Sequence, residues 1–135
     1  VGVYDENGEL LERISSEEKS DVSLVKIMDE ILNGDKFNLQ KIIYANGPGS
    51  FMGVKVAYVV LKTISIVKEC EFYAVSGFEL NGGAPIRANK NLSFVDTPEG
   101  IKLQKVQAGE FGLPQNLAVL NLNLDTLPNY VIQAV

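Results

Sequence analysis

The sequence predicts an α/β layer fold, in which helices pack against a mixed β-sheet. A short apolar segment, Lys41–Ala45, leads through a turn rich in glycine and proline into a long helical segment, Phe51–Val67. Another short apolar segment, Phe72–Val75, follows and ends at Ser76-Gly77. A strand, a helix and a second strand in this order form a βαβ unit, in which the two strands lie parallel in one sheet.

A hairpin is predicted before this unit. Val1–Tyr4 and Glu9–Ile14 are short segments of β type, and the Asn7-Gly8 pair between them is typical of a tight hairpin turn. The polar segment Ser15–Lys19 is expected to form a loop. We expect the strands of the hairpin to belong to the same mixed sheet as the βαβ unit.

The first helix is expected over Val22–Leu32. Ser20 and Asp21 offer a cap at its start, and Asn33-Gly34 offers a stop at its end. Its apolar residues cover a wider arc than contact with one sheet requires. These residues are Val22, Leu24, Val25, Ile27, Met28, Ile31 and Leu32.

The second helix, Phe51–Val67, is apolar almost all round. Ser50 is placed to cap it, and Gly47 and Gly49 in the preceding turn can adopt positive φ. A surface helix normally has one apolar face of about 100°, so this helix needs two partners. One partner is its own sheet, and the other is either a second helix of this chain or another protein. Its clearly polar residues are only Lys55, Lys62, Thr63 and Ser65.

The rest of the chain is rich in loops. A loop is expected at Glu79–Pro85, and strands are expected at Leu92–Val95, Ile101–Val106, Leu117–Leu124 and Tyr130–Val135. This portion is too short for a core of normal size. We therefore divide the chain into an α/β domain, residues 1–80, and a reduced β-rich C-terminal lobe, residues 81–135, that packs on it.

Composition excludes several classes of function. The chain has 135 residues, 46% of them hydrophobic, and a net charge of −5, so it is a poor candidate for binding nucleic acid alone. It has no histidine, which excludes Ser–His and Cys–His catalysis. The single cysteine, Cys70, fits a reducing compartment. With no signal peptide or membrane span in view, we expect a cytoplasmic protein.

The Gly-rich turn is the first candidate for chemistry. A strand–turn–helix junction presents free N–H groups and the positive end of the helix dipole, which suits a phosphate. However, Gly53 is followed by Val54, so the P-loop pattern fails, and the dinucleotide pattern fails too. The turn either binds a phosphate or merely connects the strand to the helix. The carboxylates form no catalytic pair at a recognisable spacing.

The stretch Asn46-Gly47-Pro48-Gly49-Ser50-Phe51-Met52-Gly53-Val54-Lys55 resembles the signature Gly-Pro-Gly-Ser-Phe-Thr-Gly-Leu-Arg of the TsaB (YeaZ) family. The resemblance covers residues 1–80. Asp5–Leu11 is similar to the family's second and third strands, Ile27–Leu32 to its first helix, and Tyr73–Leu80 to the segment after its second helix. Met52 stands where the family has threonine, and Lys55 where it has arginine.

The resemblance implies an actin/hexokinase-like (RNase H-like) fold. It also implies a non-catalytic scaffold subunit of the complex that makes N6-threonylcarbamoyladenosine (t6A) in tRNA. Members pair with a catalytic TsaD-type subunit through their two N-terminal helices, a TsaE-type ATPase then joins, and isolated members form homodimers through the same surface. By this resemblance the chain itself holds no cofactor. ATP and metal belong to its partner subunits, and it meets tRNA only through the complex.

Two sets of residues follow from this interpretation. The first set binds the partner: Val25, Met28 and Leu32 on the first helix, with Met52, Val56, Val59 and Thr63 on the second. The second set is the motif loop, which fixes the angle of the second helix: Gly47, Pro48, Gly49, Ser50, Phe51 and Gly53. For each residue of the first set, the alternative is burial against the chain's own sheet.

Two other functions are open on the sequence alone. One is a nucleotide-binding phosphotransferase-like or peptidase-like protein of the same superfold, which predicts ATP affinity or cleavage by the chain alone. The other is a fragment that retains only structural stability.

Overall fold

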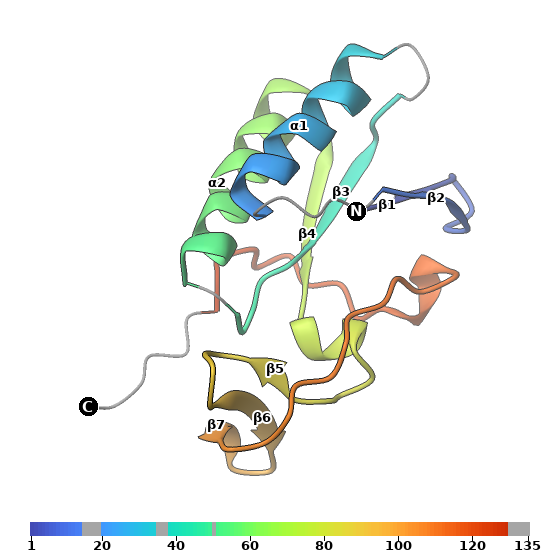
Figure 1. Cartoon of the computed structure of the whole chain (residues 1–135). Helices are drawn as coiled ribbons and strands as arrows, with labels where there is room; N and C mark the ends of the chain where they lie inside the picture. Colours follow the sequence, from blue (N-terminus) through green and yellow to red (C-terminus); the bar gives the residue numbers. More distant parts are fainter. Residues whose placement is uncertain (15–19, 35–37, 50, 130–135) are drawn as a thin grey trace.

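A computed structural model describes residues 1–14, 20–34, 38–49 and 51–129, with the side chains of 20–22, 51 and 52 left out. The predictions for Ser15–Lys19 and Tyr130–Val135, and the cap at Ser50, lie outside the described residues. The described residues form a mixed α/β structure with small sheets and two α-helices (Figure 1).

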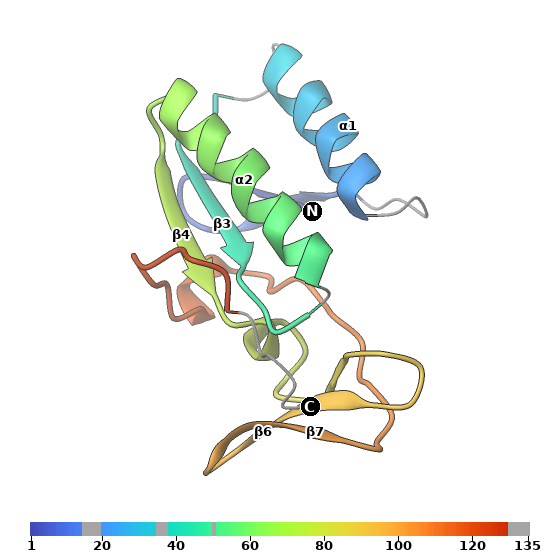
Figure 2. The ribbon, with the colours of Figure 1, turned by 90° about the vertical axis from the view of Figure 1, so that its left-hand side faces the viewer.

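The βαβ unit is present as predicted. The strands β3 (Lys41–Ala45) and β4 (Glu71–Val75) pair in parallel, with Ile42 opposite Phe72 and Tyr44 opposite Ala74. The helix α2 (Phe51–Val67) connects them. The helix α1 (Ser20–Asn33) lies beside α2 on the same face of the strand pair (Figure 2).

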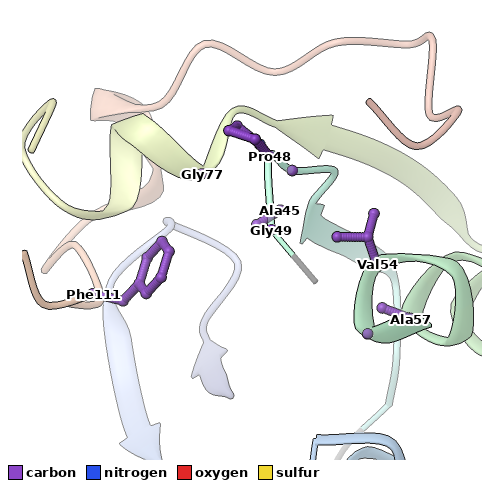
Figure 3. Close-up of a pocket in the computed structure, with 9 residues that line it drawn as sticks. Ala45, Pro48, Gly49, Val54, Ala57, Gly77 and Phe111 are labelled. Atoms are coloured by element: carbon purple, nitrogen blue, oxygen red, sulfur yellow. The ribbon is translucent and has the colours of Figure 1, made fainter. Parts of the chain in front are cut away.

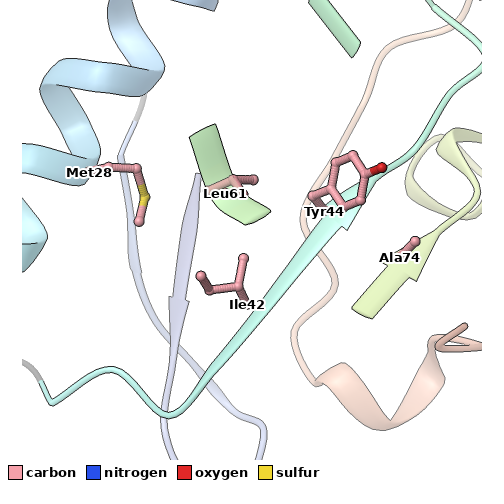
Figure 4. Close-up of a cluster of buried hydrophobic side chains, with 5 residues drawn as sticks. All are labelled: Met28, Ile42, Tyr44, Leu61 and Ala74. Carbon is pink, nitrogen blue, oxygen red and sulfur yellow. The ribbon is translucent and has the colours of Figure 1, made fainter. Parts of the chain in front are cut away.

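The core of this part lies between the helices and the strands. Its buried members are Met28 from α1, Leu61 from α2, Ile42 and Tyr44 from β3, and Ala74 from β4 (Figure 4). The alternation of β3 explains the arrangement, because every second side chain of a strand points to the same face. The Tyr44 ring also stacks on Phe72, with the ring centroids 5.2 Å apart.

The N-terminal hairpin is confirmed, but its place in a single mixed sheet is not. The strands β1 (Gly2–Tyr4) and β2 (Leu10–Arg13) pair antiparallel, and the described strands form three separate sheets. The hairpin is instead hydrogen-bonded to the C-terminal part of the chain. The N–H of Leu10 donates to the carbonyl of Gln115 at 3.0 Å, and Glu9 forms a bridge with Asn116. These contacts lie at the start of β2.

The third sheet lies at the other end of the molecule (Figure 1). After the short 3₁₀ helix η1 (Gly77–Leu80), the strands β5 (Ile86–Arg87), β6 (Ser93–Thr97) and β7 (Gly100–Gln104) form an antiparallel sheet in that order. Phe78, Ile86 and Phe94 make a second small core. The two longer strands were predicted with slightly different ends, and β5 was not predicted.

The predicted strand at Leu117–Leu124 is wrong. The segment begins with a 3₁₀ helix, η2 (Leu117–Val119), and only Asn123 forms a bridge, to Ala74. The asparagines explain the difference. The side-chain oxygen of Asn116 accepts from the N–H of Ala118 at 2.8 Å, and that of Asn123 accepts from Asp125 at 3.0 Å. Such local bonds favour turns over a continuous ladder.

Candidate functional site

The outer face of α2 is apolar and open to solvent. Val59 is 52% exposed, Ile66 65% and Val67 71%. Successive helical residues are rotated by about 100°, so Val59 lies on the side opposite Leu61, which is buried in the core. A single half-exposed apolar side chain on a helix is common in proteins. Three such side chains on one helix form an apolar patch.

The polar groups of this face do not offset its apolar character. The Thr63 hydroxyl donates to the carbonyl of Val59 at 2.7 Å, within the helix. This bond satisfies the hydroxyl within α2 itself, although the Thr63 side chain is exposed. Lys55 is exposed, while the ammonium of Lys62 lies 5.8 Å from the centre of the Phe72 ring. The residues Phe51–Val67 include no acidic side chain.

The helix α1 contributes one exposed apolar side chain to the same helical layer. Val25 is 52% exposed, and Leu32 is half-buried. The adjacent exposed positions are charged, with Asp29 and Glu30 both open to solvent. Among the predicted contact residues whose side chains are described, Val25 and Val59 are therefore the two that combine a large apolar side chain with a solvent-exposed position.

The other predicted contact residues are distributed differently. Met28 is only 6% exposed and packs with Ile42 and Leu61 in the core, so it is not part of the surface (Figure 4). The helical period explains this correction, because Leu24, Met28 and Ile31 share the face of α1 that meets the strands. Val56 is half-buried, and the side chain of Met52 lies outside the described residues.

Two exposed residues of α2 were missed by sequence reasoning. Ile66 follows Val59 by seven residues, which places it on nearly the same stripe of the helix. The spacing was therefore a usable signal. Val67 is the last residue of the helix. The exposure of its side chain could not be predicted, because valines occur on several sides of α2.

The motif loop is enclosed by other parts of the chain. The carbonyl of Gly47 accepts from the N–H of Gly77 at 2.9 Å, and Gly47 and Pro48 are buried. Asn46 accepts from Asn129 through its carbonyl at 2.7 Å. These contacts hold the turn that leads into α2, and a role of the turn in setting the angle of the helix stays a prediction. Ser50 and the side chain of Phe51 lie outside the described residues.

A shallow pocket of about 260 Å³ lies beside this loop (Figure 3). Small and apolar residues line it: Ala45, Gly47, Pro48, Gly49, Gly53, Val54, Ala57, Gly77 and Phe111. A phosphate would be held by backbone N–H groups alone here, because none of these side chains carries a charge or a hydrogen-bonding group. The lining is therefore better suited to apolar contact than to an anion.

Among the described residues, the side chains of Cys70 and Tyr73 have pKa values shifted by their surroundings in ways that do not favour acid–base chemistry. Burial raises the pKa of the Cys70 thiol, which makes it a poor nucleophile near neutral pH. A hydrogen bond to Glu71 raises the pKa of Tyr73, with smaller contributions from burial and from the Glu71 charge. In the part of the chain that the structure describes, no three His, Cys, Asp or Glu side chains are grouped as metal ligands would be.

Comparison of the chain with family models, with curated proteins and with solved structures finds no match. Among the described helices, none combines the length and the apolar character needed to cross a membrane.

Proposed function

We propose that this chain is a non-catalytic scaffold subunit whose α1–α2 face docks a partner protein. The observation that carries the proposal is the exposure of Val25 and Val59, each 52% open to solvent although their helices pack together over a shared core. An apolar face on two adjacent helices suits a partner that presents its own apolar helices.

The sequence motif supports a more specific version of this proposal, in which the partner is named. The stretch Asn46–Lys55 resembles the TsaB signature, so the proposed partner is a TsaD-type catalytic subunit of the t6A machinery in the cytoplasm. A TsaE-type ATPase then joins the pair. In this proposal the fold is a short member of the actin/hexokinase-like class, and ATP, metal and tRNA are handled by the other subunits. The net charge of −5 is in keeping with tRNA contact through the complex only.

The same surface also accounts for self-association. Without its partner, the chain would cover the α1–α2 face with a second copy and form a homodimer. Partner and second copy then compete, because both bury Val25 and Val59. A TsaD-type protein is therefore expected to dissociate the homodimer on binding.

The test is Val59→Asp, measured by titration with a TsaD-type protein and by analytical ultracentrifugation. A charge in the centre of an apolar contact should weaken binding at least tenfold, or about 1.4 kcal/mol, and should shift the dimer to monomer. The matched control is Val119→Asp, because Val119 is 70% exposed and lies in η2, away from the helices. Both variants should keep the stability of the parent within about 0.5 kcal/mol.

Two outcomes would contradict the proposal. In the first, the parent chain stays monomeric and has no affinity for a TsaD-type protein. In the second, both variants bind as the parent does. Calorimetry with ATP addresses the alternative function separately, since a phosphotransferase-like protein would bind the nucleotide without any partner.

A further inference from the structure

The chain contains four asparagines that are each followed by glycine. These pairs are Asn7-Gly8, Asn33-Gly34, Asn46-Gly47 and Asn81-Gly82. In such a pair the backbone nitrogen of the glycine can attack the side-chain amide of the asparagine, because glycine has no side chain to hinder the approach. The two reacting residues are the same in every pair, so their surroundings in the fold decide which pair reacts.

Three of the pairs are held through the side chain of the asparagine. Asn33 donates its side-chain N–H to the carboxylate of Asp29. Asn46 and Asn81 each donate a side-chain N–H to a backbone carbonyl, at 3.3 and 2.8 Å. Each of these bonds must break before the amide carbon can turn toward the next backbone nitrogen, and a broken hydrogen bond costs free energy.

The backbone restrains the same three pairs. Asn33 is the last residue of α1, and the N–H of Gly34 donates to the carbonyl of Glu30 at 3.1 Å, one turn earlier. Gly47 is buried, and so is the side-chain oxygen of Asn81. In these pairs the glycine nitrogen can therefore reach the asparagine side chain only when the structure opens locally.

Asn7 differs because its side chain is exposed and makes no hydrogen bond with the residues that the structure describes. Its backbone N–H and that of Glu9 donate to the same carboxylate oxygen of Asp5, each at 2.9 Å. The N–H of Gly8 donates to the carbonyl of Asp5 at 3.0 Å, so attack must break this bond. Two-stranded hairpins have little stability of their own, so such a turn opens readily.

We propose that Asn7 is a modification site of the folded chain, at which spontaneous loss of ammonia leads to isoaspartate. Hydroxide removes the proton of the Gly8 nitrogen, and this nitrogen attacks Cγ of Asn7. A bond forms between these two atoms, the bond from Cγ to Nδ2 breaks, and ammonia leaves with a proton taken from water. The product is a cyclic imide. This inference does not depend on the function proposed above.

Water then opens the imide at one of its two carbonyl carbons. Addition at Cγ breaks the bond from Cγ to the Gly8 nitrogen and leaves an ordinary aspartate. Addition at the backbone carbonyl carbon breaks the other bond to this nitrogen and leaves isoaspartate, in which the main chain runs through Cγ. In both products a carboxylate has replaced the amide, and in isoaspartate the main chain is longer by one carbon.

The longer main chain changes a contact between distant parts of the molecule. The carbonyl of Gly8 accepts from the N–H of Leu117 at 2.8 Å, which joins the hairpin to η2 (Figure 1). Isoaspartate at position 7 adds its extra carbon directly before Gly8 and so displaces this carbonyl. We therefore expect the modified chain to lose the bond between the hairpin and η2.

The experiment compares the folded full chain with the same chain unfolded in guanidinium chloride, both in mildly alkaline buffer. Peptide mapping by mass spectrometry follows the replacement of amide by carboxylate at each pair. The ratio of the folded rate to the unfolded rate removes the effect of the local sequence. This ratio should be at least about threefold higher for Asn7 than for the other pairs, since each of those must break an additional hydrogen bond.

Two variants at this exposed position separate the reaction from its consequence. Asn7→Gln keeps the amide but lengthens the side chain, which disfavours ring closure, so the product at this position should disappear. Asn7→Asp adds the charge without lengthening the main chain. Amide hydrogen exchange at Leu117 should be about tenfold faster in the isoaspartyl fraction, isolated by chromatography, and should stay near the parent value in Asn7→Asp.

Either of two results would overturn the proposal. In the first, the ratio of rates at Asn7 is no higher than at another pair, with Asn33 as the nearest competitor because its side chain is also exposed. In the second, Leu117 exchanges in the isoaspartyl fraction as it does in the parent. That result would mean that the bond to Gly8 survives the longer main chain.

Discussion

At the scale of the residue, Gly47 is constrained both by its backbone and by its surroundings. Its φ is 110°, which side chains rarely allow, and a Cβ placed on it would lie 2.7 Å from the carbonyl oxygen of Asn129. The sequence suggested positive φ from the Gly-Pro-Gly pattern. It could not suggest Asn129, because that contact joins residues 82 positions apart in the chain.

Replacing Gly47 separates these two constraints. Gly47→Ala should cost about 3 kcal/mol, since strain and a contact with backbone act together. Gly82→Ala is the control, because Gly82 also has positive φ, 67°, but nothing within 4 Å of its Cβ position. It should cost about 1 kcal/mol. Urea denaturation of the two variants measures the difference in their free energies of unfolding. Equal losses of stability would show that the backbone at Asn129 can move away from the added Cβ.

At the scale of the element, α2 is a helix with two different apolar faces. The sequence showed that the helix is apolar nearly all round, but not which arc faces the core. In the structure, Leu61 and Ser65 are buried, and Val59 and Ile66 are exposed. The strands decide this division, because their side chains at Ile42 and Tyr44 pack with Leu61.

Two side-chain truncations of similar size test the division of α2 into a buried face and an exposed face. Leu61→Ala should destabilise the chain by about 2–5 kcal/mol, because it leaves a cavity in the core. Ile66→Ala removes as many apolar atoms from a position that is 65% exposed and should change stability by about 0.5 kcal/mol or less. Denaturant midpoints measure both. Similar losses for the two variants would mean that Ile66 is covered in solution.

At the scale of the whole molecule, the C-terminal segment connects parts that are far apart in the chain. Leu117 donates to the carbonyl of Gly8 at 2.8 Å, Asn123 pairs with Ala74, and the hydroxyl of Tyr44 donates to the carbonyl of Thr126. These bonds join the segment 117–126 to the hairpin and to the βαβ unit. Residues 117–126 of the predicted C-terminal lobe thus contact the predicted first domain, and the division of the chain at residue 80 stays a prediction.

Tyr44→Phe tests this connection. The ring still stacks on Phe72, but the carbonyl of Thr126 loses its donor in a buried position, at a cost of about 1–3 kcal/mol. Limited proteolysis should then cut the segment near residue 126 faster. Tyr73→Phe is the control, because the Tyr73 hydroxyl binds the exposed side chain of Glu71. Unchanged stability and cleavage in both variants would show that this segment is held by other contacts.

The sequence by itself determined the hairpin, the two helices and the parallel pair around α2, because turn residues and hydrophobic period are local properties. It also singled out Val25 and Val59 as candidates for contact. Only the tertiary structure decided that Met28 belongs to the core, that the hairpin stands apart from β3, and that residues 117–124 form turns. Each of these features depends on contacts between residues that are far apart in the chain. Such contacts do not produce a periodic pattern in the sequence, so the sequence does not predict them.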